Sequence, residues 1–389
     1  MEREHRDDEP RASIAGSRSA RSTDLGRRRS CDPEKPTDGH GYHSVVPGGK
    51  CGGVLPFVTV VMPVRNEAGS IASSLAAVLR QDYPSDRLEV IVADGMSDDG
   101  TREVVEATVD AAGRGIAAVS VIDNPGRIAA TGLNAAISKA KGDVIVRVDG
   151  HCEVQPHHVR TCVRLLAETG ADNVGGLAAA RGVGPVQRAI AIATSSPFGV
   201  GNARFRYASK AGWADTVFLG AWRRETFDRI GGFDEELVRN QDDELNFRLV
   251  QSGGRIWLDP VIRTPYVPRK SLMALWRQYF EYGFCKVQVI QKRAGVASVR
   301  HLAPPAFVAV VLTAGTAASI TRRSKLLLPV AVPYASANLA ASVYAGRRDP
   351  ATLPILPVVF ATLHLSYGAG FLAGLWSWRR YFQGTWNRA

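Results

Sequence analysis

The stretch FVTVVMPVRNE, residues 57–67, is a short β-branched apolar run that ends in the polar residues Arg65, Asn66 and Glu67. Similar apolar runs follow at 88–93 (LEVIVA), 119–122 (VSVI) and 143–148 (DVIVRV). Helical patterns occupy the segments between and after them, at about 67–81, 100–112, 127–141 and 156–169. Short buried strands that alternate with helices are typical of a mostly parallel sheet covered on both faces. We therefore expect an α/β fold in this region.

Polar residues follow three of the four predicted strands. The clusters are 63–67, 94–101 and 149–152. Ligands of such sheets bind beyond the carboxyl ends of the strands, so these clusters are candidates for a binding site. Asp and Asn are also common in loops and at helix N-termini, which is the simpler interpretation for any single cluster. Three clusters at three strand ends favour a shared site for a nucleotide and a metal ion.

The charge of the chain is unevenly distributed. The 389 residues have a formal net charge of +11 and a mean hydropathy of -0.07. Residues 261–389 carry 16 basic and 2 acidic side chains, whereas residues 51–260 carry 22 and 26. A basic protein can indicate nucleic-acid binding. Here the positive excess borders long apolar stretches, so we expect a membrane partner and no nucleic acid.

Those apolar stretches predict a membrane anchor in residues 301–380. Three of them, at about 303–320, 326–345 and 351–376, contain no Asp, Glu, Lys or Arg and have the length of transmembrane helices. The region 266–300 precedes them and has an amphipathic helical pattern with basic and aromatic residues, which favours the bilayer interface. His364 lies inside the third stretch, where a polar side chain is a functional candidate.

The N-terminal residues and the cysteines indicate the cellular compartment of the protein. Residues 1–52 are poor in large apolar side chains, so we expect a disordered tail, and no apolar segment of the signal-peptide kind occurs there. The five cysteines are scattered without a CxxC pair, which argues against a disulfide framework or a zinc site and favours a reducing compartment. We therefore expect a multi-pass protein of the plasma (inner) membrane, with a cytoplasmic catalytic domain at 53–265.

Five ordered motifs resemble those of glycosyltransferase family 2. They are VTVVMPVRNE (58–67), VADGMSDDGT (92–101), NPGRIAATGLNAAISKAKGDVIVRVDGH (124–151), LGAWRRETFDRIGGFDEE (219–236) and NQDDELNFRLVQSGGRIWLDP (240–260). The resemblance covers about 55–265 and implies a GT-A fold, in which a Rossmann-like nucleotide-binding half and an acceptor-binding half share one sheet. Two further stretches, SSPFGVGNARFR (195–206) and HLSYGAGF (364–371), are most similar to bacterial exopolysaccharide transferases of the succinoglycan type.

The resemblance implies a set of donor-site residues. The nucleotide-binding candidates are Pro63, Arg65, Glu67, Asp94, Arg127, Asn134 and Asp149. A divalent cation, Mn²⁺ or Mg²⁺, would be held by Asp149 and His151, since these residues occupy the positions of the family's D-x-D motif. His151 replaces the second acid of that motif, and imidazole suits Mn²⁺ better than Mg²⁺. A hydrogen-bonding role for His151 without a metal is the alternative, and Cys152 is interpreted as a small buried apolar residue.

The resemblance also implies a catalytic residue. Asp242 falls on the general base of the family's E-D-x-D/E-L element, Gln241 stands where Glu is usual, and Glu244 falls on the second acid. Acids at a helix start are also favoured by the helix dipole alone, so the role of Asp242 depends on the resemblance. Arg204 and Arg206 end a Gly-rich segment and are candidates for holding a phosphate of the acceptor, unless that segment is an ordinary loop.

Together these observations predict an inverting glycosyltransferase. It would move a sugar from a nucleotide-sugar donor, expected to be a UDP-sugar, to a lipid-linked acceptor of the polyprenyl type in exopolysaccharide synthesis. A processive polysaccharide synthase is an alternative, although the Q-x-x-R-W motif of those enzymes does not occur here. A catalytically degenerate membrane scaffold or transporter component is another, favoured by the altered D-x-D motif and by Gln241.

Overall fold

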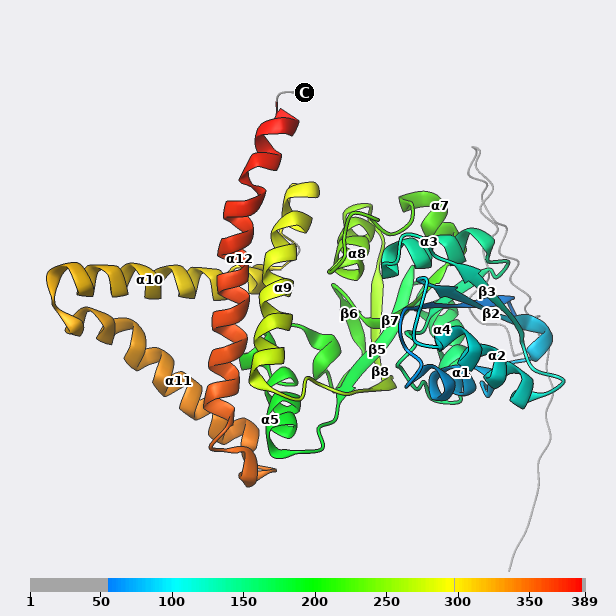
Figure 1. Cartoon of the computed structure of the whole chain (residues 1–389), viewed down its shortest axis with the longest axis horizontal. Helices are drawn as coiled ribbons and strands as arrows, with labels where there is room; N and C mark the ends of the chain where they lie inside the picture. Colours follow the sequence, from blue (N-terminus) through cyan, green and yellow to red (C-terminus); the bar gives the residue numbers. More distant parts are fainter. Residues whose placement is uncertain (1–54, 297, 387–389) are drawn as a thin grey trace, which may run out of the picture. The chain divides into compact units, whose positions relative to one another are not determined.

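The computed structural model describes residues 55–296 and 298–386 (Figure 1), so the predicted disordered tail at 1–52 lies outside the described residues. Its centre is an eight-stranded sheet with the strand order β3-β2-β1-β4-β7-β5-β8-β6. The strands are β1 (Val58–Val64), β2 (Leu88–Asp94), β3 (Ala118–Asp123), β4 (Val144–Arg147), β5 (Asn173–Ala180), β6 (Gly212–Ala214), β7 (Phe218–Arg223) and β8 (Ile256–Tyr266).

Strand direction places the carboxyl ends of most strands at one edge. The strands β1, β2, β3 and β4 pair in parallel, as do β5 and β8, whereas β7 and β6 pair antiparallel with their neighbours. The four predicted strands and the mostly parallel sheet are thus confirmed. From β1 the chain continues to β2 and β3 on one side, and β4 then pairs on the other side of β1. A sheet opens a crevice at such a reversal, between the carboxyl ends of β1 and β4.

The core lies on both faces of the sheet because side chains alternate along each strand. On β1, Val60 and Met62 belong to one buried cluster with side chains of α1 and α4, while Val61 belongs to a second cluster with side chains of α3 and α8. The helices are α1 (Ile71–Leu79), α2 (Thr101–Ala112), α3 (Ala129–Lys139), α4 (His158–Thr169), α5 (Pro185–Thr194), α6 (Pro197–Val200), α7 (Arg224–Ile230), α8 (Gln241–Gln251), α9 (Leu272–Lys292), α10 (Ala303–Thr321), α11 (Leu328–Gly346) and α12 (Leu356–Trp386).

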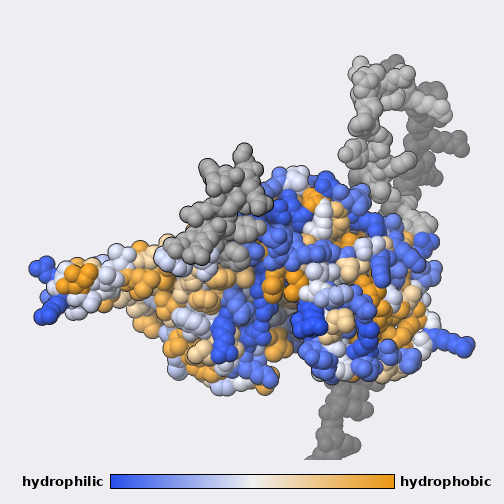
Figure 2. Space-filling model, turned by 45° about the horizontal axis from the view of Figure 1, so that its top comes forward, coloured by the Kyte–Doolittle hydropathy of each residue, from blue (hydrophilic) through white to orange (hydrophobic). Residues whose placement is uncertain are grey.

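The last third of the chain is helical. Figure 1 shows α9 and α12 side by side, with α10 and α11 forming a hairpin arm that projects away from them. Three segments are long and apolar enough to cross a membrane: Val299–Thr321, Ser324–Gly346 and Leu356–Ser377. In Figure 2 the arm is hydrophobic along much of its length and hydrophilic at its tip. Its exposed apolar side chains include Leu312, Ile320, Val332 and Val343.

Glycines allow α9 and α12 to approach closely. A Cβ atom added to Gly370 of α12 would lie 2.0 Å from the carbonyl oxygen of Phe280, and one added to Gly283 of α9 would lie 2.1 Å from that of Tyr367. Gly374 follows Gly370 by one helical turn and meets the backbone of α9 in the same way. Such spacing of small residues is a common device of packed membrane helices. This close packing against α12 fixes the position of α9, and side chains of α9 also line the site described below.

Candidate functional site

A cavity of about 1120 Å³ lies at the carboxyl edge of the sheet and extends to the apolar helices. Its wall begins at residues that follow β1 and β4, including Glu67 and Asp149, and continues past Asp242 at the start of α8. Its far end is formed by side chains of the apolar segments, including Phe307 and Leu363. One continuous space therefore connects the predicted nucleotide-binding half with the membrane anchor.

Asn66 joins the ends of β1 and β2 at this edge. Its backbone has a φ of 53°, in the left-handed region that Asn tolerates better than most residues. The amide of Asn66 donates to Ser97 Oγ at 2.9 Å, and its Oδ1 accepts from the amide of Asp98 at 3.1 Å. The amide of Glu67 donates to Thr101 Oγ1 at 2.8 Å. These bonds give the two sequence clusters after β1 and β2 a shared structural role.

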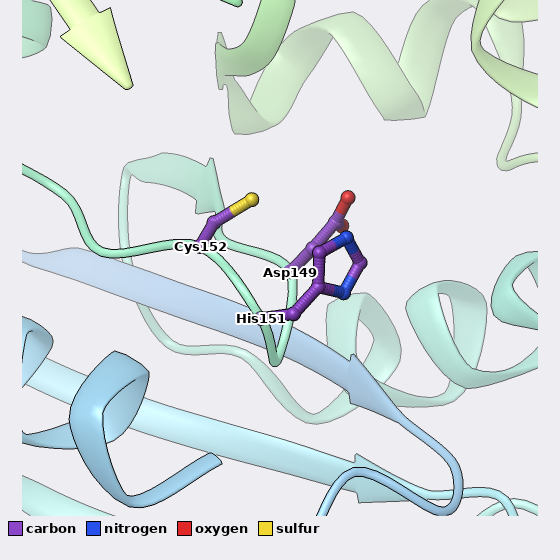
Figure 3. Close-up of side chains that lie close together, drawn as sticks. All are labelled: Asp149, His151 and Cys152. Carbon is purple, nitrogen blue, oxygen red and sulfur yellow. The ribbon is translucent and has the colours of Figure 1, made fainter. Parts of the chain in front are cut away.

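The turn after β4 carries the candidate metal ligands (Figure 3). The ligand atoms of Asp149, His151 and Cys152 lie within 4.8 Å of one another. His151 Nδ1 lies 3.0 Å from Glu67 Oε1, and this hydrogen bond raises the pKa of His151. Burial raises the pKa of the Cys152 thiol, which disfavours the thiolate form that binds metals. The carboxylate and imidazole donors of Asp149 and His151, with Glu67 beside them, therefore fit Mn²⁺ better than Mg²⁺.

Arg147 connects this turn to α8. Its Nε donates to Asp149 Oδ1 at 2.7 Å, and its Nη1 donates to Asp242 Oδ1. The Arg147 side chain is only 8% exposed, and although burial alone would lower its pKa, the two carboxylates raise it. The guanidinium thus holds the predicted metal ligand and the predicted base in one arrangement.

The acids at the start of α8 have different surroundings. The Asp242 side chain is 43% exposed and lines the cavity. Its partial removal from solvent raises its pKa, although the nearby Arg147 guanidinium acts to lower it. Asp243 pairs with Lys286 of α9 at 2.6 Å; burial would raise its pKa, but Lys286 lowers it to about 2. Glu244 is fully buried between Arg248 and Arg293, at 2.8 and 2.5 Å. Asp242 is therefore the member of this group best placed to accept a proton from a bound substrate.

Four predicted site residues do not line the cavity. Asp94 is buried and accepts a hydrogen bond of 2.5 Å from Ser97 Oγ. Asn134 joins α3 to the segment at 232–235, because its Oδ1 accepts from the amide of Phe233 at 2.8 Å and its Nδ2 donates to Glu235. Arg204 donates to a backbone carbonyl of its own loop, and Glu244 pairs with two arginines. Both side chains therefore bind groups of the protein itself. The predicted nucleotide contacts of Asp94 and Asn134 stay predictions, while Pro63, Arg65, Glu67, Arg127, Asp149, His151, Arg206, Gln241 and Asp242 line the cavity.

The structure adds site residues that the sequence patterns did not single out. Arg147 is the last residue of an otherwise apolar, buried strand, and a buried charge needs a partner, so the sequence contained a signal for its role. Tyr279, Tyr282 and Lys286 lie on the same face of α9 and line the cavity. Lys286 is one of the basic residues of the predicted interfacial region at 266–300, but it is 3% exposed and pairs with Asp243.

Comparison with known proteins places the chain in a family. A family model described as Glycosyl transferase family 2 matches residues 59–229. The succinoglycan biosynthesis protein ExoA of Rhizobium meliloti (strain 1021) is 32% identical over 325 residues, covering 82% of this chain and 96% of that protein. The chain belongs to glycosyl transferase family 2. These comparisons confirm the predicted family and the predicted enzyme class. They also confirm that the chain is similar to exopolysaccharide transferases of the succinoglycan type.

Two further comparisons agree with this assignment. A dolichyl N-acetyl-alpha-D-glucosaminyl phosphate 3-beta-D-2,3-diacetamido-2,3-dideoxy-beta-D-glucuronosyltransferase of Methanococcus voltae is 24% identical over 327 residues, covering 82% of this chain and 98% of that protein. The structure of the mannosyltransferase PcManGT from Pyrobaculum calidifontis, in complex with GDP-Man and Mn²⁺, superposes with a TM-score of 0.56 at 23% identity, covering 83% of this chain and 88% of that one. The GT-A fold is thereby confirmed. This glycosyltransferase also has the apolar helices of a membrane protein.

Proposed function

We propose that this glycosyltransferase moves a sugar, with inversion at the anomeric carbon, from a nucleotide sugar to a lipid-linked acceptor in cell-surface polysaccharide synthesis. The observation that carries the proposal is the single cavity that runs from Glu67 and Asp149, past Asp242, to Phe307 and Leu363 of the apolar helices. A soluble acceptor would not need that last section. The name of the Methanococcus voltae relative, which includes a dolichyl-linked sugar phosphate, supports the same acceptor class.

The donor half has the groups that a nucleotide diphosphate needs. Arg65 and Arg127 line the cavity together, with Arg65 Nη1 donating to the Arg127 carbonyl at 3.3 Å, so two cations stand where diphosphate oxygens would bind. A UDP-sugar is the expected donor. Asp149 and His151 would hold a divalent cation, which when bound supplies positive charge that stabilises the leaving diphosphate.

Asp242 would act as the general base. It accepts the proton of the acceptor hydroxyl while the hydroxyl oxygen bonds to the anomeric carbon and the bond from that carbon to the diphosphate breaks. One displacement of this kind inverts the anomeric configuration. Arg147 keeps the Asp242 carboxylate oriented, and the raised pKa of Asp242 makes it a better proton acceptor than an ordinary aspartate.

The membrane arrangement follows from where the substrates are. Nucleotide sugars are cytosolic, so we place the catalytic domain at 53–265 in the cytoplasm. The segments Val299–Thr321, Ser324–Gly346 and Leu356–Ser377 would then make the chain a multi-pass protein of the plasma membrane. The apolar end of the cavity would admit the lipid from the bilayer.

Transfer of radiolabelled sugar from UDP-sugars to membrane lipid extract tests this proposal. Wild-type protein should label the lipid fraction, and Asp242→Asn should reduce the rate by about 100-fold or more, as expected when a general base is removed. Asp86→Asn, at an exposed position away from the cavity, is the matched control and should leave the rate unchanged. Absence of transfer from any nucleotide sugar, or an Asp242→Asn variant as active as wild type, would show that the proposal is wrong. Labelled products that grow by many sugars would instead support a processive synthase.

A further inference from the structure

The cations that line the cavity differ in how their charge is compensated. Four of them pair with carboxylates, and these pairs are Arg147–Asp242, Arg239–Glu281, Lys286–Asp243 and Arg300–Asp215. Arg206 lines the same cavity, yet within residues 55–296 and 298–386 no carboxylate lies within ion-pair distance of it. Its Nη1 is buried and has no hydrogen-bond partner among those residues. The fold therefore holds a partly buried cation without a carboxylate partner among the described residues.

Aromatic side chains fix the position of this guanidinium. It lies over the rings of Phe205 and Tyr266, at 5.1 and 4.8 Å from their centroids. Gln278 Nε2 donates to the hydroxyls of Tyr266 and Tyr282, at 3.3 and 2.9 Å, which holds the surrounding ring hydroxyls in place. Cation–π contacts stabilise a buried guanidinium without neutralising it. The planar group thus remains available to an anionic ligand, for which Arg is well suited.

Arg204, two residues earlier in the same 3₁₀ turn, provides a contrast. Its Nη1 donates to the Trp213 carbonyl at 2.7 Å and its Nη2 to the Lys210 carbonyl at 3.1 Å. It does not line the cavity. Arg204 therefore holds the loop at 207–213 together, and the two arginines have separate roles.

The position of Arg206 indicates which anion it would take. Tyr266 ends β8, and Gln278 and Tyr282 belong to α9, so the site lies in the acceptor half. The diphosphate of the donor is accounted for by Arg65 and Arg127, on loops after β1 and β3. From the acceptor half the cavity continues to the apolar side chains of Pro304, Phe307 and Leu363. An anion carried at the head of an apolar chain is a lipid phosphate.

We propose that Arg206, within its aromatic surroundings, binds the phosphate group that links the acceptor to its lipid. The inference rests on the proposed function, because it assumes a lipid-linked acceptor. It makes Arg206 a determinant of acceptor affinity and assigns Arg204 no part in that affinity.

Two isoprenoid probes that differ only in their phosphate groups test the assignment. Binding of farnesyl diphosphate and of farnesol to the detergent-solubilised full chain would be measured by thermal shift, with UDP and Mn²⁺ in excess so that the donor half is occupied. Wild-type protein should bind farnesyl diphosphate at least ten times more tightly than farnesol. Arg206→Gln should reduce this preference by about 10-fold or more, as expected for loss of a charged hydrogen-bond donor. Arg206→Met, whose unbranched side chain fits between the two rings, repeats the test, and Arg204→Gln is the matched control.

The outcomes separate the possible roles of Arg206. Loss of the diphosphate preference in Arg206→Gln and Arg206→Met, with the preference retained in Arg204→Gln, supports the assignment. An unchanged preference in either Arg206 variant overturns it, and so does an equal weakening of farnesol binding, since that would indicate a packing role. A wild-type protein that does not distinguish the two probes also overturns it. In that case the transfer assay with lipid extract still reports independently on the proposed function.

Discussion

Arg147 reaches from the end of β4 to the first turn of α8, where its guanidinium donates to the carboxylate of Asp242, 95 residues further along the chain. The same guanidinium donates to Asp149, the candidate metal ligand. One buried cation therefore sets the relative position of the group that would bind the leaving diphosphate through a metal and the group that would accept the proton. Positioning of this kind contributes strongly to catalysis because both groups must act on one substrate.

Replacement of Arg147 should impair both stability and transfer. Arg147→Gln leaves two carboxylates without their shared cation, and breaking a buried ion pair in this way costs about 3–5 kcal/mol. We expect a lower melting temperature in detergent and a transfer rate reduced by about 100-fold or more. Arg160→Gln is the control, because Arg160 pairs with Asp82 at the exposed surface, where such pairs contribute about 1 kcal/mol or less. A fully active Arg147→Gln variant would contradict the role assigned to Arg147.

The donors of Asp149 and His151 predict a preference among metal ions. Removal of divalent cations with EDTA should reduce transfer by about 10-fold or more, and Mn²⁺ should restore it better than Mg²⁺ because imidazole binds Mg²⁺ poorly. His151→Asp restores two oxygen ligands and should shift the ratio of activities toward Mg²⁺. The measurement is transfer at matched concentrations of the two ions. Equal ratios in the variant and the wild-type protein would mean that His151 does not contact the metal.

The strands and the order of the motifs could be predicted from the sequence because their signals are local. Buried parallel strands are continuous apolar runs, and β1 and β2 were recognised within a few residues of their bounds. The groups that each site side chain contacts could not be predicted, since these contacts depend on packing between distant segments. Arg204 and Arg206 stand two residues apart in one Gly-rich stretch and have the same side chain. One bonds to the carbonyls of a local loop, and the other faces β8 and α9.

Asn134 illustrates the same limit. Its motif pointed to a nucleotide contact, but its Nδ2 donates to Phe233, 99 residues away. A Cβ atom added to Gly232 would lie 2.4 Å from Asn134 Oδ1, so the Gly-Gly-Phe sequence is needed for this contact. A long-range packing contact thus joins two motifs that lie far apart in the sequence.

His158 predicts how stability changes with pH. It is 2% exposed, and burial lowers its pKa from 6.5 to about 4. As pH falls, the unfolded chain binds this proton first, so the stability from neutral His158 is complete above pH 6.5 and is lost as pH falls toward 4. The loss would reach up to about 3 kcal/mol. Melting temperatures between pH 7.5 and 4.5 should therefore depend less on pH in His158→Leu than in wild type. Ala167→Leu, at an exposed position of the same helix, is the control and should keep the wild-type dependence.

Close packing of α9 against α12 predicts different effects for two glycine substitutions. A Cβ atom at Gly370 would lie 2.0 Å from the Phe280 carbonyl oxygen, so Gly370→Ala must push α9 away from α12. Overpacking of this kind costs about 1–3 kcal/mol, and the shift would move the Tyr279 and Tyr282 side chains that line the cavity. We expect a lower melting temperature and slower transfer to lipid, with nucleotide binding retained because the donor half lies on other elements. Gly315→Ala, at a position of α10 with nothing within 4 Å, should change neither property. Equal melting temperatures for the two variants would show that α9 and α12 do not form the close contact on which the acceptor half depends.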